Sequence, residues 1–241
     1  MKILVGCLFL FLCFRESHAQ DLVKSAVYSG QNPGLLFEGE LDLLKDARLE
    51  LLSTPAGQLY DGGGTDREIL LLVKNGSGDF HSKDPVVGLS PGSIALVLPG
   101  ERFQLKNHGS HALDFYLFSY RAKIKNSASD SARSLVRVWE DLIFNPHDKG
   151  GIRRYFDQAT SETKRFEMHV TTLNGGLRSH DPHTHKAEEI VLMIEGDTEM
   201  QIGDRFFKGR SGDVYFLGTQ VPHAIRNTGD KPCTYFAFQW Q

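Results

Sequence analysis

The sequence predicts an all-β protein built from two homologous halves, and three observations lead to this prediction. Glycine is abundant, with 24 glycines against 9 prolines in 241 residues, whereas about 7% is the ordinary glycine share. Short apolar runs rich in branched and aromatic residues recur about every 8–12 residues between turn residues, a pattern that favours a sandwich or barrel. The second half of the chain also repeats the first at an offset of 120 positions.

The repeat is visible in four pairs of matching segments. Gly76 with Gly196, Gly92 with Gly212 and Asn107 with Asn227 are each 120 positions apart, and residues 49–51 match residues 166–168 at an offset of 117. A repeat of this length indicates a duplicated domain, because the unit of a solenoid is only about 20–50 residues long. Each half then has roughly 100 residues, which is an ordinary domain size.

Each half is predicted to consist of short strands between clusters of Gly, Pro and Asn. We expect strands at 69–73, 94–98, 103–106 and 115–120 in the first half, and at 190–194, 199–202, 214–217, 224–226 and 235–240 in the second. Their close spacing favours a sandwich or barrel over units in which helices connect the strands.

One segment between the halves has helical periodicity. Leu135, Val138, Trp139 and Leu142 recur at steps of three and four after Ser131, a residue suited to the N-cap. We therefore expect a short helical connection over residues 132–144. The predicted domains are an N-terminal barrel over 20–128, a connecting segment over 129–155 and a C-terminal barrel over 156–241.

The first 19 residues are predicted to be a secretory signal peptide. Lys2 precedes an apolar run over 3–14, and Ser17 and Ala19 supply the small residues of a cleavage site after Ala19. The run of about 12 residues is shorter than the roughly 20 of a membrane-spanning helix, and a buried N-terminal helix is the alternative. We expect a secreted or periplasmic protein with no membrane association after signal removal.

Composition and charge narrow the classes of partner. Lys and Arg number 27 against 30 Asp and Glu, a formal net charge of −3, so the basic footprint of a nucleic-acid-binding protein is absent. A hydrophobic content of 40% argues against disorder. Cys233 would be the only cysteine left after signal cleavage, which excludes an intramolecular disulfide in the mature chain.

One group of residues in the second half has the composition of a metal site. His183, His185 and Glu189 are separated by even numbers of positions, so an extended strand would project all three to one face. His223 follows later, before the last apolar run. Three imidazoles and one carboxylate can hold a divalent transition metal and leave positions open for water or substrate. We expect one such metal per chain, with Mn or Fe preferred over Ni, Cu or Zn.

These residues resemble the two signature motifs of the cupin superfamily. The first motif is His183-x-His185-x3-Glu189-x6-Gly196, and the second contains His223-x3-Asn227. The resemblance covers the mature chain once the repeat is included, so it implies a bicupin with two jelly-roll barrels, also described as double-stranded β-helix barrels. It further implies metal-ligand roles for His183, His185, Glu189 and His223. The arrangement is similar to that of ureidoglycine aminohydrolases, although their usual ligand set departs from three His and one Glu.

The first half contains no imidazole at the corresponding positions. An offset of 120 places Gly63 and Thr65 opposite the two histidines, and a one-residue slip that aligns Glu68 with Glu189 gives Gly62 and Gly64. Phe103 stands opposite His223 and is expected to fill the site with hydrocarbon. We therefore predict that only the second barrel holds a metal and that the first acts as its packing partner.

A metal site with open positions favours an enzyme that acts on a small oxygenated or carboxylate substrate. The reactions that the resemblance implies are those of a lyase, a dioxygenase, an isomerase or a ureidoglycine aminohydrolase-like hydrolase. The alternative is a non-catalytic protein, either a metal-dependent receptor for a carboxylate or polyol-type ligand or a storage-type bicupin. A structural metal in an interaction module would need every coordination position closed. A homo-oligomer is compatible with each of these.

Several other residues are candidates for the neighbourhood of the metal. His180 and Asp181 adjoin the first motif and are expected in supporting or solvent-facing positions. Five further side chains could line a pocket, namely His169, Arg178, Gln201, Tyr215 and Gln239. The sequence identifies no catalytic acid or base among them.

Overall fold

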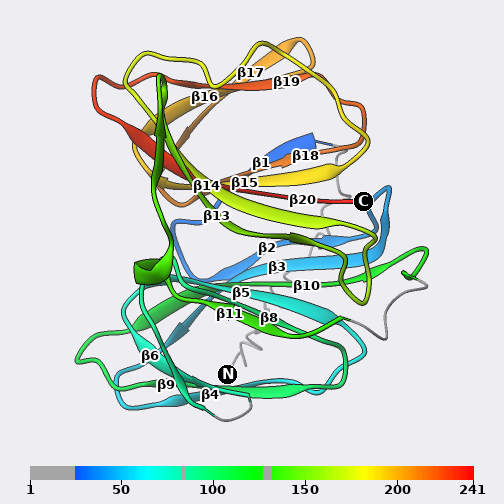
Figure 1. Ribbon diagram of the computed structural model, residues 1–241, viewed down its shortest axis with the longest axis vertical. Helices are drawn as coiled ribbons and strands as arrows, with labels where there is room; N and C mark the ends of the chain where they lie inside the picture. The colour runs from blue at the N-terminus through cyan, green and yellow to red at the C-terminus, as the bar shows by residue number, and fades with distance from the viewer. Residues whose placement is uncertain (1–24, 83–84, 127–131) are drawn as a thin grey trace, which may run out of the picture.

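The computed structural model describes residues 25–82, 85–126 and 132–241. In this part of the chain two β-barrels are stacked along the long axis of the molecule, with their larger sheets facing each other at the middle (Figure 1). The all-β, two-barrel prediction is thereby confirmed. The predicted signal peptide over 1–19 and the predicted cap Ser131 lie outside the described residues. No helix in the described ranges is long and apolar enough to cross a membrane.

The N-terminal barrel consists of two antiparallel sheets, ordered β11-β8-β5-β10-β3-β2 and β4-β9-β6-β7. Its strands are β2 Gly34–Gly39, β3 Leu44–Thr54, β4 Leu59–Gly63, β5 Glu68–Asn75, β6 Gly78–His81, β7 Val87–Leu89, β8 Ile94–Val97, β9 Arg102–Asn107, β10 Leu113–Ala122 and β11 Leu135–Arg137. Alternate side chains of β9 are buried, as expected when one face of a strand packs on a core. The core of this barrel includes Leu71, Phe103 and Phe115.

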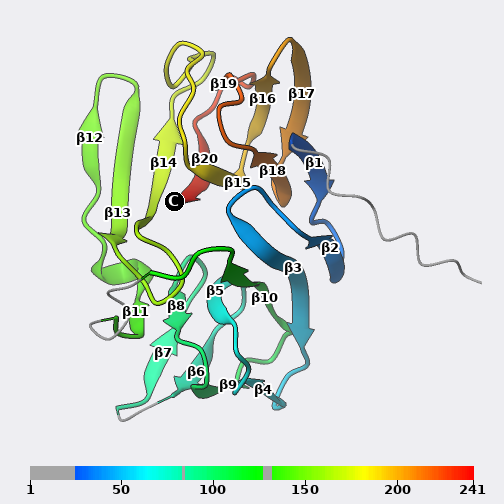
Figure 2. The same ribbon diagram turned by 90° about the vertical axis from the view of Figure 1, so that its right-hand side faces the viewer.

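The C-terminal barrel combines a larger sheet, β1-β18-β15-β20-β14-β13-β12, with a smaller one, β17-β16-β19. Its strands are β1 Ser25–Ser29, β12 Asn145–His147, β13 Gly150–Gln158, β14 Phe166–Leu173, β15 Glu188–Glu195, β16 Asp197–Ile202, β17 Arg205–Arg210, β18 Asp213–Leu217, β19 His223–Asn227 and β20 Cys233–Trp240. Every strand that the sequence predicted is present in one or the other barrel. β12, an edge strand of the larger sheet, and its neighbour β13 lie along one side of the molecule (Figure 2).

Asn107 and Asn227, which match in the sequence repeat, play the same structural role in the two barrels. Asn107 donates from Nδ2 to the Thr54 and His111 carbonyls and accepts the Gly109 amide. Asn227 makes the same three bonds, to the Leu173 and Lys231 carbonyls and from the Gly229 amide. The asparagines therefore close the equivalent turns between β9 and β10 and between β19 and β20, where buried backbone groups would otherwise lack partners.

Two segments pair outside the barrel that their place in the sequence suggested. β1 lies within the stretch assigned to the N-terminal barrel, but it pairs with β18 of the C-terminal barrel. β11 lies within the expected connecting segment, and it adds to β8 of the N-terminal barrel. In both cases an apolar strand covers the free edge of a sheet, which removes an unpaired row of backbone groups.

The predicted helix over 132–144 is wrong. This stretch contains β11 and a single 3-10 turn, η2 Trp139–Asp141. Tertiary contacts override the helical periodicity: Leu135 and Val136 join the ladder of β8, and the Trp139 amide donates to Ser93 Oγ at 3.1 Å. The Trp139 ring also lies directly over Gly92, where a Cβ atom would come within 2.5 Å of it.

A shared apolar core joins the two barrels. It contains buried aromatic residues from both facing sheets, and the ring centroids of Phe118 and Trp240 are 5.2 Å apart. Leu49 and Phe118 come from the first barrel, whereas Met168 and Phe238 come from the second. Because burial of apolar surface is the main stabilising term in folding, the two barrels are expected to unfold as one unit.

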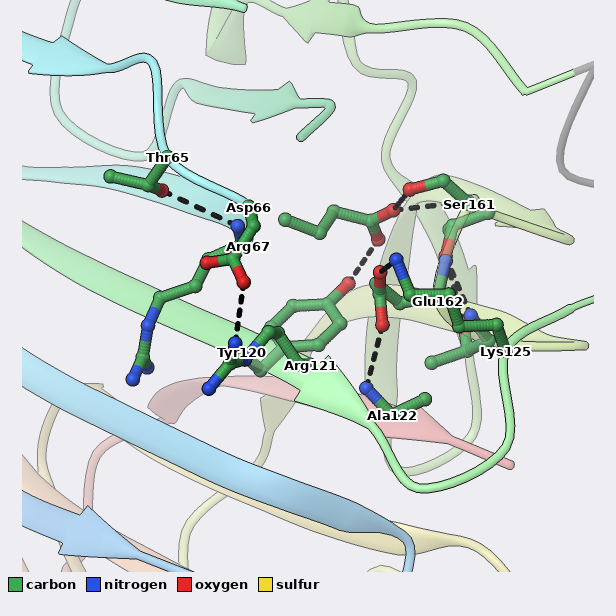
Figure 3. A network of polar contacts seen from close by, with 12 residues as sticks. Thr65, Asp66, Arg67, Tyr120, Arg121, Ala122, Lys125, Ser161 and Glu162 are labelled. Carbon is green, nitrogen blue, oxygen red and sulfur yellow. Dashed lines mark hydrogen bonds and ion pairs between the residues drawn. The ribbon is translucent and has the colours of Figure 1, made fainter. Parts of the chain in front are cut away.

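Two groups of hydrogen bonds, centred on the buried carboxylates of Glu68 and Glu188, join the two barrels, and we call them the two clasps. In the first clasp, Glu68 accepts hydrogen bonds from the Tyr120 hydroxyl of its own barrel and from the backbone amide and hydroxyl of Ser161. Figure 3 shows Tyr120 and Ser161 directed toward the same carboxylate. Next to it, Glu162 accepts the Ala122 amide at 2.7 Å and pairs with Lys125.

The second clasp is the counterpart of the first at the other end of the interface. Glu188 accepts the Asp42 amide at 2.7 Å, the Leu43 amide at 3.2 Å and the Trp240 indole N–H at 3.0 Å. In each clasp a carboxylate at the start of a strand binds an aromatic side chain of its own barrel and a loop of the other. This reciprocity is the pattern of a two-fold symmetric interface, in which the same patch is used on both sides.

Candidate metal centre

The predicted ligands lie where two strands of the C-terminal barrel begin. His183 and His223 form an isolated antiparallel bridge, with their amides and carbonyls 3.1 and 3.2 Å apart. His223 opens β19, and Glu189 is the second residue of β15. The expectation of one continuous strand through His183, His185 and Glu189 is wrong, because the chain bends at 186–187 before β15 starts.

The four side chains nevertheless converge. One ring nitrogen from each of His183, His185 and His223 lies within 4.8 Å of the other two. Glu189 Oε2 is 3.1 Å from His185 Nε2 and 3.4 Å from His223 Nε2. Bridge pairing places two of the histidines side by side, and the bend brings the third residue and the carboxylate to the same point.

Backbone carbonyls orient two of the imidazoles. His185 Nδ1 is 2.9 Å from the Ala187 carbonyl, and His223 Nδ1 is 2.8 Å from the Val221 carbonyl. A carbonyl can only accept, so each Nδ1 carries a proton, and Nε2 is the nitrogen left on each ring to bind a metal. This is the arrangement in which metal-binding histidines are held, with one nitrogen bonded to a carbonyl or carboxylate and the other directed at the ion.

One observation that does not depend on the sequence spacing of the ligands supports the fit of this donor set to a divalent transition metal. His223 Nε2 is buried and has no hydrogen-bond partner among the described residues. Leaving such an atom unpaired costs free energy, and a bound cation is a partner that an unprotonated nitrogen can take. His183, His185 and His223 would hold the ion, and Glu189 is close enough to supply a carboxylate oxygen.

Electrostatics in the site favour the metal-binding protonation states of Glu189 and His183. Burial by itself would raise the pKa of Glu189, but the hydrogen bond from His185 and the nearby rings of His185 and His223 outweigh it and bring the pKa to about 2. The pKa of His183 is lowered by burial and by the neighbouring histidines. The hydrogen bond to Glu189 raises the pKa of His185. Glu189 is therefore ionised and His183 is neutral at physiological pH.

A cavity of about 520 Å³ opens over these residues. Apolar side chains such as Val191, Ile225 and Tyr235 form part of its wall, and Lys149 and His147 also line it. Lys149 Nζ donates to the Ser179 carbonyl at 3.0 Å, which holds the ammonium group in place. The size suits a small molecule, since ligand sites are usually about 300–1,000 Å³.

Of the five further candidates, two line this cavity and three do not. His169 and Gln239 are among its lining residues. Tyr215 is instead buried in the barrel core and bonded to Thr198, Gln201 bonds to the Gly203 carbonyl, and Arg178 is exposed. His180 and Asp181 also line the cavity, and the His180 ring centroid is 4.2 Å from that of His183.

The residue that sequence reasoning missed is Glu167. It is almost fully buried, and it bonds to both His169 and Gln239. The sequence pattern that could have indicated Glu167 is a glutamate two positions before a histidine on a strand, because this spacing places both side chains on one face.

The corresponding place in the N-terminal barrel is filled. Gly62 pairs with Phe103, as His183 pairs with His223, so the one-residue slip is the correct alignment for the histidine positions. Phe103 is 2% exposed, and its ring is stacked on Phe80 at 5.3 Å. A Cβ atom at position 62 would come within 2.3 Å of the Phe103 ring, so glycine is needed there. The prediction that Phe103 fills the site is confirmed.

The one-residue shift that aligns Gly62 with His183 does not hold at Glu189. Glu68 pairs with Tyr120 as Glu188 pairs with Trp240, so Glu68 corresponds to Glu188 of the second clasp and not to Glu189. The counterpart of Glu189 is then Ile69, a core residue. All four predicted ligand positions are thus without a donor in the N-terminal barrel.

Two family models match parts of the chain. Residues 169–238 match a family model described as a cupin domain, and residues 52–167 match one described as an AraC-like ligand binding domain. No curated protein matches the sequence. The first of these matches contains all four predicted metal ligands.

Solved structures resemble the whole two-barrel arrangement. Oxalate decarboxylase from Lactobacillus farciminis, solved as a formate complex, has 12% identity and a TM-score of 0.67, with 92% of this chain and 87% of that chain covered. Protein Ylba from E. coli has 17% identity and a TM-score of 0.65, with 95% and 97% covered. AerE from Microcystis aeruginosa has 13% identity and a TM-score of 0.66, with 89% and 99% covered. At these identities the likeness concerns the fold.

Proposed function

We propose that this chain, a two-barrel member of the cupin superfamily, is a metal-dependent enzyme that acts on a small carboxylate in its C-terminal barrel. One observation carries the proposal. Three imidazoles, two of them held at Nδ1 by backbone carbonyls, converge with an ionised carboxylate at a cavity of about 520 Å³. The other barrel has an aromatic side chain at the same place, so a single site serves the chain.

The chain's own residues would bind and orient the substrate. A divalent transition metal, when bound, supplies Lewis acidity toward an oxygen of the substrate. Lys149 and His147 line the cavity and would attract an anionic group, because long-range attraction raises the local concentration of an oppositely charged ligand. Val191, Ile225 and Tyr235 also line the cavity; they would exclude water from it and strengthen each polar contact.

The choice of substrate is guided by the solved relatives and by the site. Oxalate is the first candidate, since one structurally similar protein is an oxalate decarboxylase. α-Keto acids, uronates, catechols and ureidoglycine complete the panel, because each presents two oxygens or an oxygen and a nitrogen that can chelate a metal. We further propose that the enzyme acts outside the cytoplasm, on the strength of the signal-like residues 1–19.

The test begins with metal analysis of the purified chain, followed by incubation with the panel. We expect about one divalent metal per chain, and release of CO2, uptake of O2 or release of ammonia with at least one compound. His183→Ala combined with His223→Ala should abolish metal binding. His108→Gln, a substitution of an exposed histidine of the N-terminal barrel, is the control and should leave it unchanged.

Each contrary outcome has a defined meaning. Retention of metal by the double variant, or a wild-type chain without stoichiometric metal, would refute the site. Stoichiometric metal and tight ligand binding without turnover of any compound would instead support the non-catalytic receptor.

A further inference from the structure

A second polar group lies in the same cavity, on β14 and β20 and apart from the metal histidines. His169 and Gln239 both line the cavity, and both contact the carboxylate of Glu167. His169 Nδ1 is 2.7 Å from Glu167 Oε1, and Gln239 Nε2 is 3.0 Å from Glu167 Oε2. Each carboxylate oxygen therefore has one partner, and we call this unit the Glu167–His169 pair.

Strand geometry explains why these side chains meet. Glu167 and His169 alternate along β14 with Met168 and Val170, which belong to the core between the barrels. Glu167 is paired across the ladder with Gln239. Because side chains on a strand alternate between faces, the apolar residues face the other barrel and the polar ones face the cavity.

The proton of His169 is located by its partner. Burial alone would raise the pKa of Glu167, but the hydrogen bond to His169, the charge of that ring and the hydrogen bond from Gln239 outweigh it and lower the pKa. An ionised carboxylate can only accept hydrogen bonds, so His169 Nδ1 carries the proton. In a neutral imidazole held in this way, Nε2 has the lone pair. A cavity-lining imidazole with this tautomer is a ready proton acceptor.

The N-terminal barrel has a different pair at the same register. The Asn107–Thr54 and Asn227–Leu173 bonds align the two strands, and counting back from them places Arg48 opposite Glu167 and Glu50 opposite His169. Arg48 Nη2 and Glu50 Oε1 form an ion pair at 2.6 Å. A guanidinium stays charged and has no lone pair to offer. At this register, the described residues therefore place a carboxylate–imidazole pair in the barrel that contains the histidine cluster and an ion pair in the other.

We propose that His169 is the proton acceptor and donor of the site, that Glu167 positions it, and that the substrate is a small acid with a second, proton-bearing group, such as an α-hydroxy acid. The inference rests on the proposed function. In the step, an O–H bond of the substrate breaks and its electron pair stays on oxygen, while an N–H bond forms at His169 Nε2. The imidazolium is balanced by the Glu167 carboxylate, as in other enzymes with an oriented histidine. Reverse transfer returns the proton to the product.

The first experiment reads the proton without relying on turnover. The chain is loaded with zinc, labelled with 15N at histidine, and examined by NMR near pH 7.5 before and after addition of glycolate, an α-hydroxy acid. Free protein should show His169 protonated at Nδ1 and bare at Nε2. Bound glycolate should protonate Nε2. In Glu167→Gln the fixed preference for Nδ1–H should be lost, because the amide offers a donor as well as an acceptor.

The second experiment measures rate on whichever acid the wild type converts. His169→Gln should retain metal and lower kcat by about 10²–10⁴-fold, the usual contribution of general acid–base catalysis, with KM changed less than threefold. Glu167→Gln should lower kcat in the same direction. His108→Gln is the matched control, because His108 also pairs with a carboxylate, that of Asp79 at 2.8 Å, but on the exposed surface of the other barrel; its kcat should equal the wild type.

The outcomes separate this inference from the proposed function. Turnover that survives His169→Gln within threefold, or glycolate that binds and leaves Nε2 bare, would overturn the role of His169 while the metal enzyme stands. A chain that neither binds metal nor converts or binds any acid overturns both. A metal-loaded variant with normal secondary structure and the expected loss of kcat supports both.

Discussion

Replacing Phe103 with alanine should destabilise the protein strongly and leave its metal site intact. An aromatic side chain buries roughly 150–250 Å², which corresponds to about 4–6 kcal/mol at about 25 cal/mol per Å². Measured Phe→Ala substitutions in cores cost about 3–5 kcal/mol. Phe103 is 2% exposed and packs on Phe80 and Tyr60, with ring centroids 5.3 and 6.0 Å away. We therefore expect a loss of about 3–5 kcal/mol in the free energy of unfolding.

A second substitution, at Gly62, tests whether this residue and the Phe103 ring pack against each other. Gly62→Ala places a methyl group 2.3 Å from the Phe103 ring, so alone it should cost about 1–3 kcal/mol through overpacking. In the Phe103→Ala background the same methyl enters a vacated space, and its cost should vanish. The two substitutions should thus be non-additive by about 1–3 kcal/mol, as expected for residues in contact.

Urea unfolding followed by circular dichroism, with metal content measured on each variant, decides the matter. Wild type, both single variants and the double variant complete the cycle. If the free-energy changes of the two substitutions add within about 0.5 kcal/mol, or if Phe103→Ala loses its metal, the Phe103 ring does not fill the place of a metal site in the N-terminal barrel. Phe103→His should still bind one metal per chain, because Gly62, Gly64 and Ile69 supply no donors.

Three further predictions concern other parts of the molecule. Glu188→Ala should lower the free energy of unfolding by about 3 kcal/mol, because it leaves three buried donors of the second clasp without an acceptor. The control is Glu195→Ala, a substitution of an exposed residue on the same strand, which should change the free energy of unfolding by less than about 0.5 kcal/mol in the same urea titration. Equal losses in the two variants would refute the clasp. Chelation of the metal should lower Tm in a concentration-dependent way, because a ligand bound only to the native state stabilises it; an unchanged Tm in differential scanning calorimetry would contradict the site. Burial raises the pKa of the Cys233 thiol from 9.0 to about 11. The resulting stability is fully present below pH 9 and is lost as pH rises through 11, so the stability difference between wild type and Cys233→Ala should shrink over that range, and a constant difference would refute it.

Much of the fold follows from patterns that are local in the sequence. The strands at 69–73 and 190–194 were predictable because branched residues in short runs between glycines have few other conformations open to them. The duplicated turns at Asn107 and Asn227 were visible as matching residues. The same reasoning could not have avoided the wrong prediction of a helix over 132–144, because the helical periodicity of the sequence is real. It is overridden only by the contacts of Leu135 with β8 and of Trp139 with Gly92.

By itself, the sequence determined the duplication, the all-β class, and the histidines and glutamate that one half has and the other lacks, since these depend on residue type and spacing. Only the tertiary structure decided which strand covers which edge, that Glu68 is a clasp and not a lost ligand, and that Glu167 orients His169. The physical reason is the same in each case. Hydrogen bonds such as Asp42 to Glu188 or Gln239 to Glu167 join residues far apart in the chain, and they exist only once packing has brought their strands together.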